Sequence, residues 1–529
     1  MTTRTKVMAL AHPILFALIP VLSLVSHNIQ EISPSYAIRA ALLVLAAAGA
    51  LLWIFDRVFK DLNRAALSTS MTLALFFSYG HVLGGFLGAG PRALFERVGL
   101  IGEQGALTLV WLSLWALCLW ALGRLSRWLP LGNTMFVMMA LGALAIPAFN
   151  MIRNEILLRQ PWPAEARPPA AELRAGPDIY YIVLDGYASA DVLAEVYGYD
   201  NSPFLEFLEH EGFTVAGDAR SNYPQTALSI ASSLNMDYLD DVAAQVGVDS
   251  NDRLPLARLI RWSEVRRALK ERGYRVMNLA SGYRMTELEN ADLFLSPPLT
   301  RTTTFDRLMI ETSGLIALQD LATSLGVEIP PVGYEAHRER ILFALDRLVS
   351  VAAEPGPKFV FAHIIAPHPP FVFGSEGQPI QNRRPFTLMD GDAFTGTRQE
   401  YITGYTDQLT YINGRMENVI RRILLSSETP PVIVIQADHG PGLGLVWSSA
   451  KETDLTERLA ILNAYYLPGE APAQVNGSIT PVNTFRLIFQ RYFGLDYPLL
   501  PDRSSFATWN QPYQFIPLQE QAGRLVVAP

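Results

Sequence analysis

Residues 431–440 read PVIVIQADHG, a run of apolar, partly β-branched residues that ends in a carboxylate, an imidazole and a glycine. The apolar run predicts a buried strand. Asp438 and His439 then stand at its carboxyl end, where open α/β sheets carry their ligands. An oxygen donor beside an imidazole nitrogen suits Zn²⁺ or Mn²⁺. Because Gly440 follows, the backbone can turn sharply and direct both side chains at one ligand.

Strand and helix patterns alternate along the chain before and after this run. Strands are expected at 179–184, 276–279, 359–362, 432–435 and 459–467, and helices near 189–197, 203–211, 263–272, 335–353, 399–425 and 482–493. Such alternation predicts an α/β fold with a mostly parallel sheet that carries helices on both faces.

Asp185 ends the first expected strand, in the same position relative to its strand as Asp438. On its own it would be a turn or helix-capping aspartate. Together with Asp438 and His439 it gives two carboxylates and one imidazole. Such a set leaves a metal coordination position open for a nucleophile or a substrate oxygen.

A helix start is expected within 221–235, with Pro224 in its first turn. Thr226 would then lie where free backbone N–H groups and the helix dipole favour anions. A metal can activate such a hydroxyl as a nucleophile. Ser229 lies one turn later and competes for this role, and both residues could equally be ordinary small helix residues.

The first 152 residues are of a different kind, because they carry five long apolar stretches. These run over approximately 8–26, 37–55, 65–89, 104–123 and 130–152. Each is close to the roughly 20 residues that a helix needs to cross a bilayer. A cleaved signal peptide would explain the first stretch and leave the other four unexplained.

The charges of the connecting segments give the orientation. Basic residues gather in the N-terminal segment and in the second and fourth loops, at Arg4, Lys6, Arg57, Lys60, Arg64, Arg124 and Arg127. The positive-inside rule makes these segments cytoplasmic. Five crossings then place everything after residue 153 outside the cytoplasm, at the outer face of a bacterial cytoplasmic (inner) membrane.

We expect three parts: a five-helix transmembrane domain at 1–153, a proline-rich linker at 154–177 and an extracytoplasmic catalytic domain at 178–529. The five prolines of 159–177 favour a stiff spacer. The only cysteine, Cys118, lies in the fourth apolar stretch, so the catalytic domain has no disulfide. A net charge of −8 argues against a nucleic-acid partner.

Asp185, Thr226 and the Asp438–His439 pair, in this order, resemble the alkaline-phosphatase and sulfatase superfamily. The five-helix layout is similar to membrane-bound phosphotransferases of the lipoteichoic acid synthase and phosphoethanolamine transferase type. The resemblance implies that these four residues hold one metal, Mn or Zn, and that Thr226 also carries a covalent intermediate. A second metal would need ligands for which the sequence offers no complete set.

Two departures qualify this resemblance. The close relatives usually carry Glu at the position of Asp185, whereas Asp is found in the wider superfamily, including phosphatases. The cysteine or serine of the Cys/Ser-x-Pro-x-Arg motif of sulfatases is missing around Thr226. This absence argues against sulfate ester hydrolysis.

Residues 361–371 add two histidines near the same sheet edge. We expect His368 to contact the substrate phosphate or to protonate the leaving group, as the resemblance implies, because a histidine can do either near neutral pH. His363 is a substrate-binding candidate that could equally be a packed strand residue. Asn222 and Arg284 are weaker candidates for the phosphate pocket. His81, polar at membrane depth, is a candidate whose role stays open.

These observations predict the transfer of a phospho-substituted head group, of the phosphoglycerol or phosphoethanolamine type, from a membrane phospholipid to an envelope glycan or lipid acceptor. A metal-dependent phosphodiesterase or phosphatase would use the same residues with water as the acceptor. A non-enzymatic envelope scaffold is the third alternative, against which the presence of all four site residues argues.

Overall fold

In the computed structural model of the protein, residues 2–89, 103–124, 128–162, 176–298, 304–325, 327, 332–382, 384, 386–469 and 475–529 are described. The loop between the third and fourth apolar stretches and most of the proline-rich linker at 154–177 lie outside these residues. The predicted orientation of that loop and the predicted stiff spacer therefore stay predictions. The described chain forms two compact units. One contains Met1–Glu155 and Leu299–Gly333, and the other contains Ile156–Pro298 and Tyr334–Pro529.

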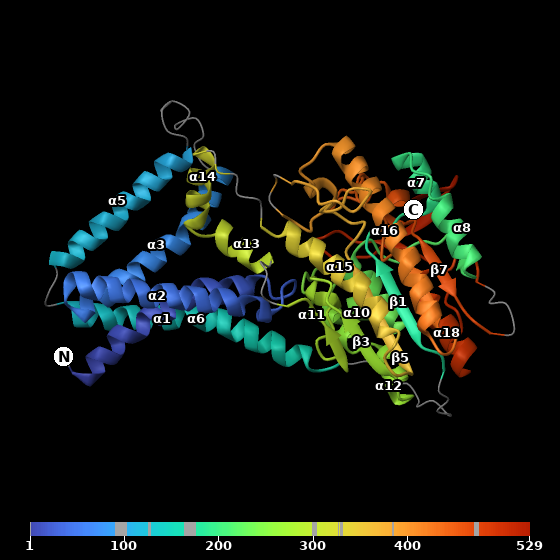
Figure 1. The fold of residues 1–529 in the computed structure, drawn as a ribbon, viewed down its shortest axis with the longest axis horizontal. Helices are drawn as coiled ribbons and strands as arrows, with labels where there is room; N and C mark the ends of the chain where they lie inside the picture. Colours follow the sequence, from blue (N-terminus) through green and yellow to red (C-terminus); the bar gives the residue numbers. More distant parts are fainter. Residues whose placement is uncertain are drawn as a thin grey trace. The chain divides into compact units, whose positions relative to one another are not determined.

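The five apolar stretches form five long helices, as the sequence predicts. They are α1 (Thr3–His27), α2 (Ile38–Phe59), α3 (Leu62–Ala89), α5 (Glu103–Arg124) and α6 (Leu129–Leu158) (Figure 1). All five are long and apolar enough to span a membrane. The N-terminal part of the chain is therefore membrane-spanning, and a domain with a different fold follows it.

A buried polar cluster joins three of these helices. Nδ1 of His12 in α1 lies 2.7 Å from the Ser70 hydroxyl in α3, and its Nε2 lies 2.6 Å from Oδ1 of Asn133 in α6. Interhelical hydrogen bonds of this kind satisfy polar groups that lipid cannot satisfy. His81, the polar residue at membrane depth whose role stays open, has an exposed side chain.

A seven-stranded sheet forms the centre of the second unit. Its strands lie in the order β2 (Thr214–Val215), β7 (Asn463–Tyr466), β6 (Val432–Gln436), β1 (Ile179–Leu184), β5 (Lys358–Ile364), β3 (Arg275–Leu279) and β4 (Leu293–Leu295). The five strands from β6 to β4 run parallel, and β7 is antiparallel to β6. The sheet is therefore mostly parallel, as predicted.

Helices cover both faces of this sheet. Neighbouring residues of a strand point to opposite faces. On β1 the Tyr181 ring packs edge-on against Phe485 of α18 (Thr484–Phe493), whereas Tyr180 points to the opposite face. The helices and turns of this unit are α7 (Ala190–Tyr197), α8 (Ser202–His210), α9 (Thr226–Asn235), α10 (Asp240–Val246), α11 (Leu254–Arg261), α12 (Glu264–Glu271), η3 (Arg284–Thr286), α15 (Tyr334–Val351), η4 (Gly391–Ala393), α16 (Arg398–Ser426), α17 (Leu455–Leu459), η5 (Pro481–Asn483) and α18 (Thr484–Phe493). Strand β1 is buried along its whole length, and its sequence is accordingly a continuous apolar run.

Two features of the fold were not predicted from the sequence. The chain between β4 and α15 forms α13 (Thr304–Glu311) and α14 (Leu315–Ser324), and this segment belongs to the unit of the transmembrane helices. The expected catalytic range 178–529 is thus interrupted. The second feature is a small antiparallel sheet of β8 (Ser505–Phe506), β9 (Ile516–Gln521) and β10 (Arg524–Val527) near the C-terminus.

Candidate active site

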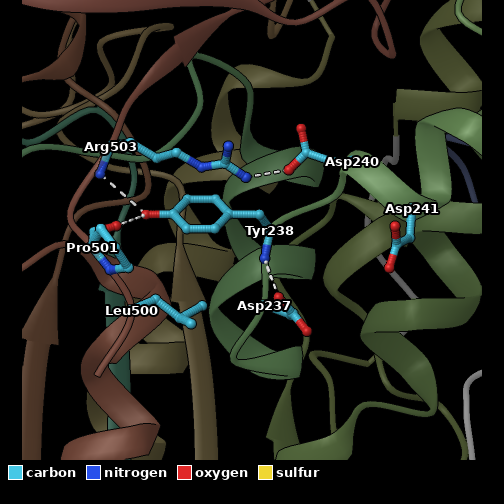
Figure 2. Close-up of a pocket in the computed structure, with 7 residues that line it drawn as sticks. All are labelled: Asp237, Tyr238, Asp240, Asp241, Leu500, Pro501 and Arg503. Atoms are coloured by element: carbon cyan, nitrogen blue, oxygen red, sulfur yellow. Dashed lines mark hydrogen bonds and ion pairs between the residues drawn. The ribbon is translucent and has the colours of Figure 1, made fainter. Parts of the chain in front are cut away.

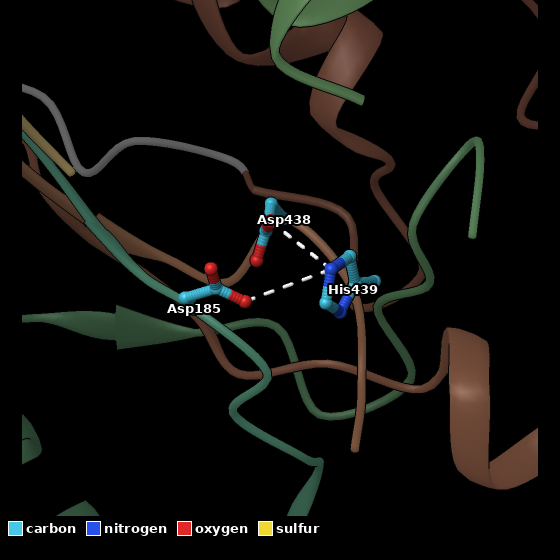
Figure 3. A group of neighbouring side chains, drawn as sticks. All are labelled: Asp185, Asp438 and His439. Carbon is cyan, nitrogen blue, oxygen red and sulfur yellow. Dashed lines mark ion pairs between the residues drawn. The ribbon is translucent and has the colours of Figure 1, made fainter. Parts of the chain in front are cut away.

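Three acidic and imidazole side chains meet at the carboxyl end of the sheet. Because β1 pairs in parallel with β6, the residues that follow these two strands are neighbours. Asp185 directly follows β1, and Asp438 and His439 follow β6. Their donor atoms all lie within 4.8 Å of one another (Figure 3).

The first residue of α9 completes this cluster. Oγ1 of Thr226 lies 3.1 Å from Nε2 of His439. Helix α9 begins at Thr226 and not at Pro224 as expected, so the proline stands two residues before the helix. Thr226 nevertheless lies in the first turn, where backbone N–H groups are free. Ser229, the competing hydroxyl, is buried one turn later and lies 3.2 Å from the Ser221 hydroxyl.

The orientation of His439 leaves one ring nitrogen for a ligand. Its Nδ1 lies 2.9 Å from the carbonyl oxygen of Gly440 and therefore carries the proton of the neutral ring. Nε2 faces Thr226 and both carboxylates. Gly440 is required here, because a Cβ at this position would lie 2.0 Å from the carbonyl oxygen of Glu457.

Burial disfavours the charged form of both carboxylates, but the pKa values of the two groups shift in opposite directions. Burial, followed by the charge of Asp185, raises the pKa of Asp438 to about 6. Burial would also raise the pKa of Asp185, but His368, the contact with His363 and the nearby His439 outweigh it and hold this pKa below its usual value. Burial, followed by the charge of Arg458, lowers the pKa of His439.

These residues fit a divalent metal ion. One buried oxygen of each carboxylate, Oδ1 of Asp185 and Oδ2 of Asp438, has no hydrogen-bond partner within the described structure. Two buried like charges at such distances are costly unless a cation offsets them. Two carboxylates, a neutral imidazole and a hydroxyl make a mixed oxygen and nitrogen ligand set.

His363 on β5 lies behind Asp185. Its Nε2 is 3.2 Å from Oδ2 of Asp185, and its Nδ1 is 2.9 Å from the hydroxyl of Thr286. Both nitrogens lie beside protein groups. This placement fits a residue that orients Asp185, and the substrate contact expected of His363 stays a prediction.

His368 lies beside the cluster. Its backbone N–H donates to the carbonyl oxygen of Asp185, and its ring centroid is 6.1 Å from that of His439. Nδ1 lies 2.5 Å from the carbonyl oxygen of Pro369, and Nε2 lies 3.8 Å from Oδ2 of Asp390. The expected proximity of His368 to the site is present.

The two weaker candidates have other surroundings. The side chain of Asn222 donates to the carbonyl oxygen of Arg503 and accepts from the N–H of Val482, so it ties backbone segments together. Arg284 is buried in η3, the short helix that also carries Thr286. The part of Asn222 and Arg284 in a phosphate pocket stays a prediction.

Two site residues escaped the sequence analysis. Arg458 is buried, and it donates to the carbonyl oxygens of Pro224 and Gly440, which flank Thr226 and His439 in the sequence. Asp390 is fully buried, with Oδ2 3.5 Å from Nη1 of Arg458. A lone arginine and a loop aspartate carry no spacing signal that could have revealed them.

A surface hollow lies apart from this cluster (Figure 2). It is lined by Asp237, Tyr238, Asp240, Asp241, Leu500, Pro501 and Arg503. Arg503 is paired with Asp240 and stacks over the Tyr238 ring at 3.8 Å, and the Tyr238 hydroxyl donates to Pro501. The groups of this hollow thus pair largely with one another.

The sheet and its edge define an α/β enzyme whose site fits a divalent metal beside a hydroxyl side chain. The sulfatase family model matches residues 177–485, and the chain belongs to the sulfatase family, within the alkaline-phosphatase superfamily. A search of curated protein sequences gave no significant match.

Solved structures with a similar fold include two phosphoethanolamine transferases. The zinc complex of the C-terminal periplasmic domain of EptC from Escherichia coli is 12% identical, with a TM-score of 0.42 over 68% of this chain and 96% of that one. The integral membrane lipooligosaccharide phosphoethanolamine transferase A from Neisseria meningitidis is 13% identical, with a TM-score of 0.33 over 86% of this chain and 88% of that one.

Proposed function

We propose that the protein transfers a phospho-substituted head group from a membrane phospholipid to an envelope glycan or lipid acceptor through Thr226. The observation that carries this proposal is the position of the Thr226 hydroxyl, 3.1 Å from His439 and at the N-terminus of α9. Asp185, Asp438, His439 and Thr226 would hold one Zn or Mn ion. When bound, the metal lowers the pKa of the hydroxyl and offsets negative charge on the phosphate.

The first half of the reaction loads Thr226. The Thr226 hydroxyl first releases its proton to water. The resulting alkoxide oxygen attacks the phosphorus of the donor, and the bond from phosphorus to the diacylglycerol oxygen breaks. His368, beside the cluster, donates a proton to the departing alcohol. The free N–H groups in the first turn of α9 stabilise charge on the phosphoryl oxygens.

The second half restores the enzyme. An acceptor hydroxyl gives its proton to His368 and attacks the same phosphorus, and the bond to the Thr226 oxygen breaks. A hydrolase would differ only in using water as the acceptor. The catalytic domain would act outside the cytoplasm, at the outer face of a bacterial inner membrane, where lipid head groups and envelope acceptors are both present.

The test uses the purified full-length protein and a phospholipid labelled in its head group. In the absence of an acceptor we expect a labelled adduct on the peptide that contains Thr226, and none in Thr226→Ala. Thr403→Ala, an exposed threonine on α16, serves as the matched control and should form the adduct normally. An adduct of normal yield in Thr226→Ala would reject the proposed nucleophile. Free head-group phosphate released equally with and without acceptor alcohols would indicate a hydrolase.

A further inference from the structure

The segment α13–α14 is a part of the transmembrane unit that lies within the sequence of the catalytic domain. It leaves that domain after Pro298 and returns to it at Tyr334. Phe305 and Met309 of α13 are buried in an apolar cluster with residues of α1, of α2 and of the turn between them, which are Val21, Leu24, Val25, Ile29, Ile32, Ala37 and Ala40. An ion pair of 2.5 Å between Asp306 and Arg39 adds to this contact.

The turn between α13 and α14 contacts the backbone of a membrane-spanning helix. The N–H of Gly314 donates to the carbonyl oxygen of Phe76 in α3 at 2.7 Å. A Cβ on Gly80 would lie 2.2 Å from the carbonyl oxygen of Glu311, and a Cβ on Gly314 would lie 2.8 Å from the Phe76 ring. Glycines on both sides thus permit a close approach, as small residues do between helices in membranes.

The position of Phe76 gives the depth of this contact. Helix α3 runs from Leu62 to Ala89, and its sequence stays apolar to that end. Phe76 stands 13 residues before Ala89, which corresponds to about 20 Å along a helix. The contact with Gly314 therefore lies near the middle of the apolar span of α3.

Apolar side chains of α14 and of the residues after it are exposed. They are Leu315, Leu318, Leu321, Leu325 and Val327, with Leu318 exposed by 57% and Leu321 by 56%. Leu315, Leu318 and Leu321 are spaced by three residues within α14, which places them on one side of the helix. Helix α5 of the same unit exposes a similar apolar surface, including Leu109, Val110, Leu112 and Leu117. The exposed side chains of this unit are thus apolar on α5 as well as on α14, as they are on a surface that contacts lipid.

We propose that α14 is a lipid-binding element inserted into the hydrocarbon region of the membrane, with its leucine face against the acyl chains of membrane lipids. The backbone contact at Phe76 fixes it at membrane depth, and its connections at Pro298 and Tyr334 join the membrane to the middle of the catalytic sequence. A segment of this kind gives the catalytic domain a second covalent attachment to the bilayer besides the linker that follows α6.

Spin labelling of the full-length protein in lipid vesicles tests this placement independently of catalysis. Cys118 is the only cysteine, so Cys118→Ala provides a background without native thiols. Leu318→Cys and Leu321→Cys report on the leucine face. Leu425→Cys, an exposed leucine at the end of α16 in the catalytic unit, is the matched control. Two label positions on α14 keep the test decisive if one substitution impairs folding.

The accessibility of each label to dissolved oxygen and to a water-soluble nickel chelate gives the result. Labels at 318 and 321 should collide more often with oxygen, which concentrates in the lipid, and the label at 425 should show the reverse order. The same order at 318 and 321 as at 425 would overturn the proposal, because it would place α14 in water. Shielding from both reagents would also overturn it, since a protein partner would then cover the face.

Discussion

At the scale of single residues, the site depends on side chains that hold others in place. His363 lies 3.2 Å from Asp185 and 2.9 Å from Thr286, so the Asp185 carboxylate is oriented by a chain of two residues behind it. Arg458 holds the backbone next to Thr226 and His439 through its hydrogen bonds to the carbonyl oxygens of Pro224 and Gly440. Partners of this kind fix the geometry that metal binding and phosphoryl transfer require.

Replacing Thr286 by valine tests this positioning role. Thr286→Val keeps the shape of the side chain but removes its hydrogen bonds to His363, to Ser281 and to the carbonyl oxygen of Tyr283. We expect metal affinity or turnover to fall about tenfold, the lower end of the effect of residues that contact a metal ligand directly, because Thr286 acts through His363. Metal titration and steady-state kinetics of the purified protein measure the effect. The exposed control Thr403→Val should change neither quantity, and an unaltered Thr286→Val enzyme would contradict the role.

The raised pKa of Asp438 predicts a pH dependence of metal binding. Because this pKa is about 6, the metal-free carboxyl group takes up a proton below that pH, whereas a metal ligand must be ionised. The apparent metal affinity should be flat above pH 7 and fall about tenfold per pH unit below pH 6. Calorimetric titration between pH 5 and pH 8 measures this profile. An affinity that stays constant down to pH 5 would be inconsistent with a buried Asp438 ligand.

At the scale of elements, the parallel pairing of β1 with β5 and β6 brings Asp185, His363 and Asp438 to one edge. Each follows or ends a strand, so the sheet converts distant sequence positions into neighbours. Helix α9 then adds Thr226 from the side. The turn after β6 must pass close to the segment of α17, and only glycine fits there.

Two glycine-to-alanine substitutions distinguish the steric requirement for glycine in the turn after β6 from the general effect of glycine on helix stability. Gly440→Ala would place its Cβ 2.0 Å from the Glu457 carbonyl oxygen, so we expect a loss of about 1–3 kcal/mol in stability and a displaced His439. Gly414→Ala, at an exposed and open position of α16, should instead raise stability by about 0.5–1 kcal/mol. Melting temperatures and activities of the two variants provide the comparison. A Gly440→Ala enzyme with normal activity and melting temperature would show that the turn can shift freely.

At the scale of the whole molecule, two units of different chemistry share one chain. One is built from apolar helices and the other from a sheet with its own core. The chain passes from the second unit back to the first through α13 and α14, so the units are not consecutive in sequence. This interleaving has a consequence for any soluble fragment.

A fragment of residues 176–529 should behave differently with and without the inserted segment. If residues 304–327 are kept, Phe305 and Met309 lose their partners in α1 and α2, and the exposed leucines of α14 remain. We expect this fragment to aggregate or to bind vesicles. Replacing the segment by a short Gly-Ser linker should give a fragment that stays monomeric without detergent. Sedimentation and vesicle flotation compare the two, and equal solubility would contradict the assignment of the segment to the membrane.

The sequence by itself determined the transmembrane helices, most strands of the main sheet and the residues that follow those strands. Apolar length defined the five transmembrane helices, and buried strands followed by Asp185 and by Asp438–His439 defined the sheet edge, because these signals are local in the chain. Only the tertiary structure decided how the side chains pair. Arg458 and Asp390 join the site, His363 turns to Asp185, and α13–α14 returns to the membrane helices, because each of these depends on contacts between residues far apart in sequence, for which local patterns carry no signal.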